Sequence, residues 1–123
     1  MRLSLPLLLL LLGVTACAGF NKTSLKHWYP PPDTETEIVL TRAPGVSEAL
    51  TRKVVAAVNR LRELDLAKPP GVAETIDWAR TLDFLGETDL SPGNARDTLG
   101  AVVKDRDDLE VVHDNLEEIT SGA

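Results

Sequence analysis

The chain has 123 residues, of which 43% are hydrophobic and 26% are charged. This length fits one small domain, and the apolar first twenty residues leave the rest with a modest core. Nineteen acidic and thirteen basic residues give a net charge of -6. Because no cluster of Lys and Arg is present, the composition argues against a nucleic acid as partner. Cys17 is the only cysteine, which excludes an internal disulfide and a thiolate metal cage.

The N-terminus has the form of a secretory signal peptide: Met1-Arg2 is followed by an apolar run that ends near Val14. The run is too short to span a bilayer comfortably, which takes about 20 apolar residues. The run ends in Val14-Thr15-Ala16-Cys17, which resembles the bacterial lipoprotein signal, where small residues precede a cysteine that becomes the lipidated N-terminus. We therefore expect a signal peptide over residues 1–16, a lipobox over 14–17 and a lipid anchor on Cys17.

This interpretation places the chain in the bacterial cell envelope, attached to the membrane through lipidated Cys17. The alternatives are an unused upstream start codon and an apolar run that is never processed. Either alternative would leave a cytoplasmic product of a mispredicted or truncated gene.

Residues 17–32 are expected to form a linker with a short extended segment, which Pro30-Pro31-Pro32 ends. Trp28 and Tyr29 directly precede the prolines and are a candidate contact surface. Asp33 is predicted to be a helix N-cap, with Glu35 and Glu37 in the first turn of a helix over 34–42.

Two amphipathic helices are predicted in the centre of the chain. Ser47 is the expected N-cap of the first, whose apolar positions recur at steps of three and four: Leu50, Val54, Ala57, Val58, Leu61 and Leu64. Residues Arg52, Asn59, Arg60 and Glu63 are then expected to face water. The break Lys68-Pro69-Pro70-Gly71 precedes a second helix over 72–85, which is predicted to end at Gly86. Its expected buried face comprises Val72, Ile76, Ala79, Leu82 and Leu85.

The C-terminal third predicts one more helix, or a long helix bent near Lys104, that docks on the first two. Ser91 is its expected N-cap, with Pro92 at the first helical position. Its apolar stripe comprises Leu99, Val102, Val103, Leu109, Val112, Leu116 and Ile119. The predicted fold class is all-α, a small bundle of four or five helices over 33–120, with a tail over 121–123.

Other candidate sites have a structural interpretation that we prefer. The stretch 104–110 offers four carboxylates, but it lacks the glycine and the distant glutamate of a calcium loop, so it predicts a solvated helix face. His27 and His113 have no ligand partner at helical spacing, which favours surface or satisfied histidines over a catalytic base or a metal ligand. Trp78 is expected in the core.

Several blocks in order, from about Lys22 to the end, resemble the C-terminal lid of a MoxR-type AAA+ ATPase together with the last strand before it. They are SLKHW at 24–28 through Pro32-Asp33, EIV at 37–39, APGVSEAL at 43–50, LDLAKPPGVAETIDWA at 64–79 and DTLG at 97–100.

The resemblance implies a helical lid that, in a complete relative, covers a nucleotide in a hexameric, chaperone-like ATPase, often with von Willebrand A-type partners. The phosphate-binding loop GxxxxGK(S/T) is absent, so the chain is expected not to be an enzyme on its own. It is also expected to need no cofactor, because ATP and Mg2+ are bound only by a complete family member. Lys22-Thr23 stand where the family usually carries an arginine pair. Glu74 and Thr75 stand where many such lids place a nucleotide-sensing arginine.

Two functions are therefore expected. The first is a non-catalytic lid fragment that contacts a protein partner or a separately encoded ATPase core. The second is a lipid-anchored envelope protein that uses its helical bundle as an interaction module.

Overall fold

The computed structural model describes residues 28–121, and this part of the chain contains helices and no strand. The elements are α2 (Pro32–Arg42), α3 (Glu48–Glu63), α4 (Val72–Phe84), α5 (Pro92–Thr98), the 3-10 turn η1 (Leu99–Ala101), α6 (Arg106–Asp114) and α7 (Leu116–Thr120). The predicted all-α bundle is confirmed, with six α-helices in the described range instead of four or five. The proposed signal peptide 1–16, Cys17, Lys22-Thr23 and His27 lie outside the described residues.

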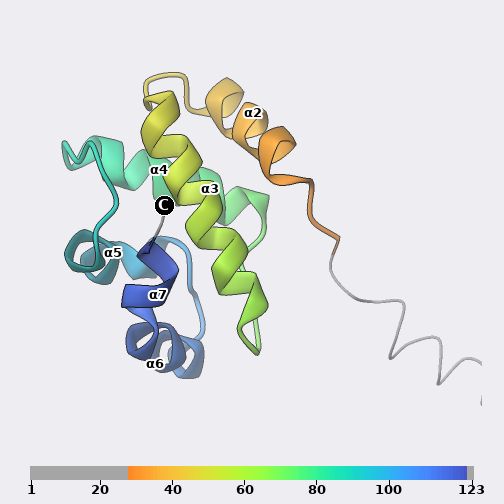
Figure 1. The fold of residues 1–123 in the computed structure, drawn as a ribbon, viewed down its shortest axis with the longest axis vertical. Helices are drawn as coiled ribbons and strands as arrows, with labels where there is room; N and C mark the ends of the chain where they lie inside the picture. The colour runs from red at the N-terminus through yellow and green to blue at the C-terminus, as the bar shows by residue number, and fades with distance from the viewer. Residues whose placement is uncertain (1–27, 122–123) are drawn as a thin grey trace, which may run out of the picture.

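Helix α3 lies at the centre of the bundle and contacts α2, α4 and α7 (Figure 1). Its N-cap is Ser47, whose hydroxyl accepts the Leu50 N–H at 3.2 Å, as predicted. Its apolar stripe is buried at Leu50, Val54, Val55, Ala57, Val58 and Leu61. Asn59 and Arg60 were expected to face water, but both are half-buried. Asn59 donates to the Val55 carbonyl, and Arg60 donates to the Ile119 carbonyl of α7.

Helix α4 buries Trp78, which confirms the prediction of a core residue, and the indole N–H donates to the Thr98 hydroxyl at 2.7 Å. The expected apolar stripe is only partly correct, because Leu85 is 56% exposed. Leu85 is the C-cap residue, so it lies beyond the helical periodicity. Gly86 follows with φ 77°, which is the left-handed conformation expected of a glycine after a helix.

The start of α2 corrects the prediction that Asp33 is its N-cap. The helix begins at Pro32, with Pro31 as N-cap, and Asp33 lies in the first turn. Proline suits the first helical position because its fixed φ is already helical and its missing N–H would have no partner there.

The C-terminal part is divided into more pieces than its apolar spacing predicts. Ser91 caps α5 as expected, through its hydroxyl to the Asn94 N–H. The chain then leaves the helix after η1, and Asp105 caps a new helix by accepting the N–H groups of Asp107 and Asp108. Asn115 separates α6 from α7. The predicted stripe is nonetheless buried, with Leu109 half-buried at its edge.

Among the helices of the described range, none combines the length and the hydropathy needed to cross a bilayer.

Candidate functional site

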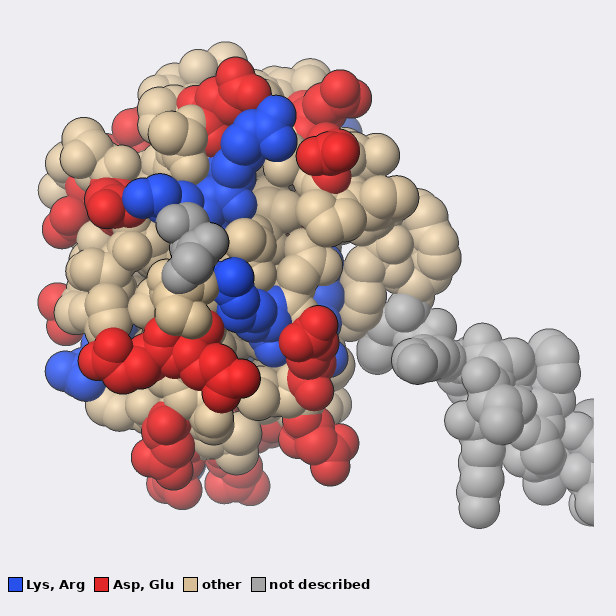
Figure 2. Space-filling view, viewed as in Figure 1, with Lys and Arg blue, Asp and Glu red and all other residues tan. Residues whose placement is uncertain are grey.

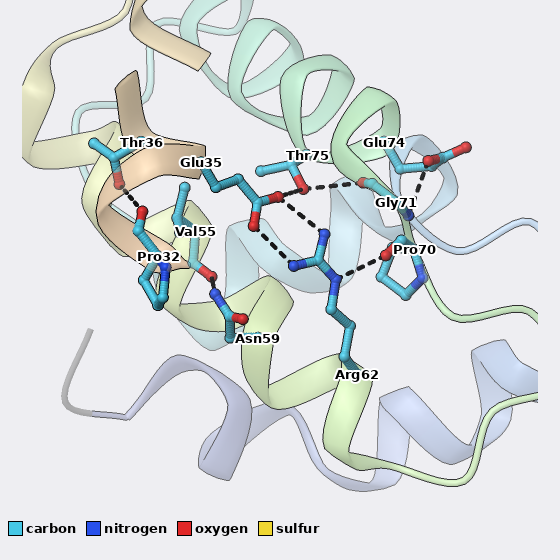
Figure 3. Close-up of polar contacts among 10 residues, drawn as sticks. All are labelled: Pro32, Glu35, Thr36, Val55, Asn59, Arg62, Pro70, Gly71, Glu74 and Thr75. Carbon is cyan, nitrogen blue, oxygen red and sulfur yellow. Dashed lines mark hydrogen bonds and ion pairs between the residues drawn. The ribbon is translucent and has the colours of Figure 1, made fainter. Parts of the chain in front are cut away.

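The polar centre of the bundle is an ion pair between Glu35 of α2 and Arg62 of α3, shown in Figure 3. The Glu35 side chain is fully buried, and that of Arg62 is 5% exposed. The guanidinium binds the carboxylate in a bidentate manner, Nη1 to Oε1 at 2.8 Å and Nη2 to Oε2 at 2.9 Å. Two parallel charge-assisted hydrogen bonds fix both distance and orientation, so α2 has one defined position on α3.

Three further groups complete this cluster. The Thr75 hydroxyl of α4 donates to Glu35 Oε2 at 2.8 Å, and Arg62 Nε donates to the Pro70 carbonyl at 2.9 Å (Figure 3). The Arg62 guanidinium also lies over the Tyr29 ring, 3.9 Å from its centroid. The cluster therefore joins α2, α3, α4, the loop before α4 and the segment before α2.

The contacts of the Glu35–Arg62 cluster favour a structural role, in which the cluster stabilises one arrangement of the helices, over a catalytic role. A buried ion pair offsets its desolvation only when geometry and additional hydrogen bonds are good, and both conditions are met here. The Glu35 carboxylate already accepts three hydrogen bonds from the protein. The carboxylate is fully buried, so it has no contact with solvent.

A second buried carboxylate, Asp108 of α6, corrects the expectation that the acidic stretch 104–110 is a solvated face. Asp108 accepts the backbone N–H groups of Ala67 and Lys68, both at 2.8 Å. These two donors belong to the loop between α3 and α4, where no helical partner is available to them. The neighbouring Asp107 and Glu110 are exposed, as expected.

The two residues at the supposed nucleotide-sensing position have local structural partners. The Glu74 carboxylate accepts the Gly71 N–H at 3.0 Å, at the start of α4. Thr75 is fully buried against Glu35. Both side chains therefore fix the beginning of α4.

The candidate contact surface divides between two environments. Trp28 is 81% exposed. Tyr29 is half-buried, with its ring against Arg62.

His113 is exposed on α6, where it lines a shallow hollow with Leu109, Glu110 and Asp114. The described residues contain no group of His, Cys, Asp and Glu side chains arranged to hold a metal ion.

Surface ion pairs shift two ionisable groups. The hydrogen bond from Lys53, together with the Leu90 N–H, lowers the pKa of Asp89. The hydrogen bond and charge of Glu48, with a smaller effect of Asp33, raise the pKa of Arg52. Both groups are in solvent, and each shift is accounted for by its neighbours on the surface.

The Glu35–Arg62 pair was not predicted, and neither was the capping role of Asp108. The sequence contained one indication of the pair. The apolar residues of each helix define its buried face, and Glu35, Arg62 and Thr75 lie on those faces. A charged residue at such a position usually has a buried partner of opposite charge.

Comparison with known proteins gives no match for this chain, neither among family models nor among curated proteins or solved structures.

Proposed function

We propose that this chain is a non-catalytic, lid-like helical module, similar to the C-terminal part of a MoxR-type AAA+ ATPase, that acts through contacts with other proteins. The observation that carries the proposal is the engagement of its buried carboxylates. Glu35 is held by Arg62 and Thr75, and Asp108 by two backbone N–H groups. Charged groups committed to the fold in this way stabilise a scaffold and are closed to a substrate.

The start of α4 supports the same proposal. In the resembled family this helix often brings a cationic sensor to the nucleotide, whereas here Glu74 and Thr75 have partners within the bundle. A carboxylate at that position would also repel the phosphates of a nucleotide. The role that remains for such a lid is to dock on another protein, either a separately encoded core or a different partner.

The test is ATP binding and hydrolysis by the purified chain. We expect no phosphate release above a protein-free reaction, and no change in the thermal unfolding midpoint when Mg-ATP is added, because a ligand that binds the folded state raises that midpoint. Hydrolysis that follows the protein through two unrelated purification steps would refute the proposal. The DNA upstream of Met1 provides a second test, since a reading frame with a GxxxxGK(S/T) loop would identify a core as partner.

A second candidate function is a lipid-anchored envelope protein that presents the same bundle, and Val14-Thr15-Ala16-Cys17 favours it. The Cys17→Ser chain should then move from the membrane fraction to the soluble fraction. Thr41→Ser, an exposed position on α2, is the matched control and should fractionate like the natural chain. Membrane association that is equal in all three chains would contradict this candidate.

A further inference from the structure

Besides Trp28, which precedes α2, large apolar side chains of the described residues are exposed at the end of α4 and on α6. Phe84 and Leu85 lie at the C-terminal end of α4, and Phe84 is 89% exposed. Val111 lies on the outer face of α6 and is 40% exposed. Burial of either place would remove apolar surface from water, which is favourable.

The place beside Phe84 is a shallow hollow with a positive balance of charge. It lies where the turn between α2 and α3 meets the end of α4, and its lining includes Arg42, Pro44, Val46, Arg80, Asp83 and Phe84. Two guanidinium groups oppose one carboxylate there. Neither Arg42 nor Arg80 forms an ion pair within residues 28–121, although Arg80 Nη2 donates a hydrogen bond to the Arg42 carbonyl. The hollow therefore suits an occupant with an apolar side chain flanked by carboxylates.

The outer face of α6 has the opposite character. Leu109, Glu110, His113 and Asp114 line its hollow, with Val111 exposed beside them. Figure 2 shows acidic side chains gathered at the α6–α7 end of the molecule. Glu110 and Asp114 likewise form no ion pair in the described range. The outer face of α6 therefore carries an exposed apolar side chain and carboxylates without ion pairs, which are complementary to the hollow beside Phe84.

We infer that the hollow beside Phe84 docks the outer face of α6 from a second copy of this chain. The two surfaces differ, so the contact is heterologous. The turn between α2 and α3 and the α6 helix lie at opposite ends of the bundle (Figure 1), so one copy can use both surfaces at once. The expected assembly is an open, head-to-tail chain of copies that grows with concentration. This inference goes beyond the proposed function and does not depend on it.

Cysteine cross-linking of the full chain tests this contact. A disulfide forms only where the two introduced cysteines meet, so association through another segment does not produce it. In a Cys17→Ser background, one chain carries Leu85→Cys and the other carries His113→Cys, both at exposed positions. Under mild oxidation, the mixture should form the mixed disulfide faster than a mixture of Leu85→Cys with Thr41→Cys, an exposed control position. Sedimentation should show species larger than a dimer as concentration rises.

Charge reversal completes the test. Arg80→Glu on the Leu85→Cys chain should slow the mixed disulfide by about two- to fivefold, as expected for one exposed ion pair. Asp114→Arg on the His113→Cys chain should do the same, and the two reversals together should restore the rate. Equal rates with the Thr41→Cys control, or reversals that do not compensate, would overturn the inference. A complex formed only with a different protein would overturn it too.

Discussion

Arg62 has the largest number of distinct partners of any side chain described above. It binds Glu35, the Pro70 carbonyl and the Tyr29 ring, so one guanidinium organises segments that lie far apart in the sequence. Five donors in a rigid planar fork make this possible, and lysine could not replace it with one compact ammonium group.

Arg62→Leu should lower the free energy of unfolding by about 3–5 kcal/mol, because it leaves the Glu35 carboxylate buried without a counter-charge. The double variant Glu35→Leu/Arg62→Leu should lose less than Arg62→Leu alone, since no unpaired charge remains. Urea unfolding of the three chains measures both quantities. A double variant that loses as much stability as Arg62→Leu, or more, would contradict this coupling of the two charges.

Lys53 and Asp89 allow a prediction on pH. Lys53 lowers the pKa of Asp89, so this pair adds stability above the ordinary aspartate pKa and loses it as the pH falls through the lowered value. Lys53→Met should raise the pKa of Asp89 toward its ordinary value, without restoring it fully because the Leu90 N–H remains. An NMR titration of the Asp89 carboxyl carbon measures the change. An unchanged pKa would contradict the assigned cause.

At the scale of elements, the ends of helices are encoded locally and the register between helices is not. Ser47 and Ser91 cap their helices as the sequence predicts, because a cap needs only a side-chain oxygen and a backbone N–H three residues away. Leu85 was wrongly predicted to be buried, because the spacing of apolar residues does not show where the helix ends. The same limit explains why six α-helices were predicted as four or five.

The contacts that define the candidate site lie beyond the reach of such local patterns. Glu35 was predicted correctly in the first turn of α2, but its partner is 27 residues away on α3. Asp108 was assigned to a solvated face because its acidic neighbours suggested one, whereas its partners are backbone groups about forty residues earlier. Side-chain chemistry alone does not specify such pairings. The lid resemblance, the lipid anchor and the lack of ATPase activity remain predictions.

Gly86→Ala should destabilise the bundle by about 1–2 kcal/mol, because φ 77° is costly for a residue with a Cβ atom. The side chain itself would meet no atom within 4 Å, so the cost isolates the backbone conformation. Gly100→Ala is the matched control, since Gly100 has open space and no positive φ. Thermal unfolding midpoints compare the two, and an equal effect at both positions would refute this explanation.

At the scale of the whole molecule, the two tryptophans report on opposite environments. Trp78 is fully buried and hydrogen-bonded to Thr98, whereas Trp28 is 81% exposed just before α2 begins. The chain thus has one internal probe of its core and one external probe beside the bundle.

Acrylamide quenching of the natural chain should therefore resolve an accessible and a protected emission. Trp28→Phe should remove the accessible component and leave a blue-shifted spectrum that acrylamide quenches weakly. Urea should then shift that spectrum in one cooperative transition, because Trp78 contacts the common core. Strong quenching of the Trp28→Phe chain before unfolding would show that the core is open to solvent.

The Asp108 clamp on the loop between α3 and α4 has a consequence for synthesis on the ribosome. The loop reaches its final hydrogen-bonded state only after a residue 40 or 41 positions later has been added. At about 5–20 residues per second, translation takes about 2–8 s to cover that interval. During those seconds the amides of Ala67 and Lys68 are without their carboxylate, so this turn lacks two of the hydrogen bonds that hold it in the finished bundle.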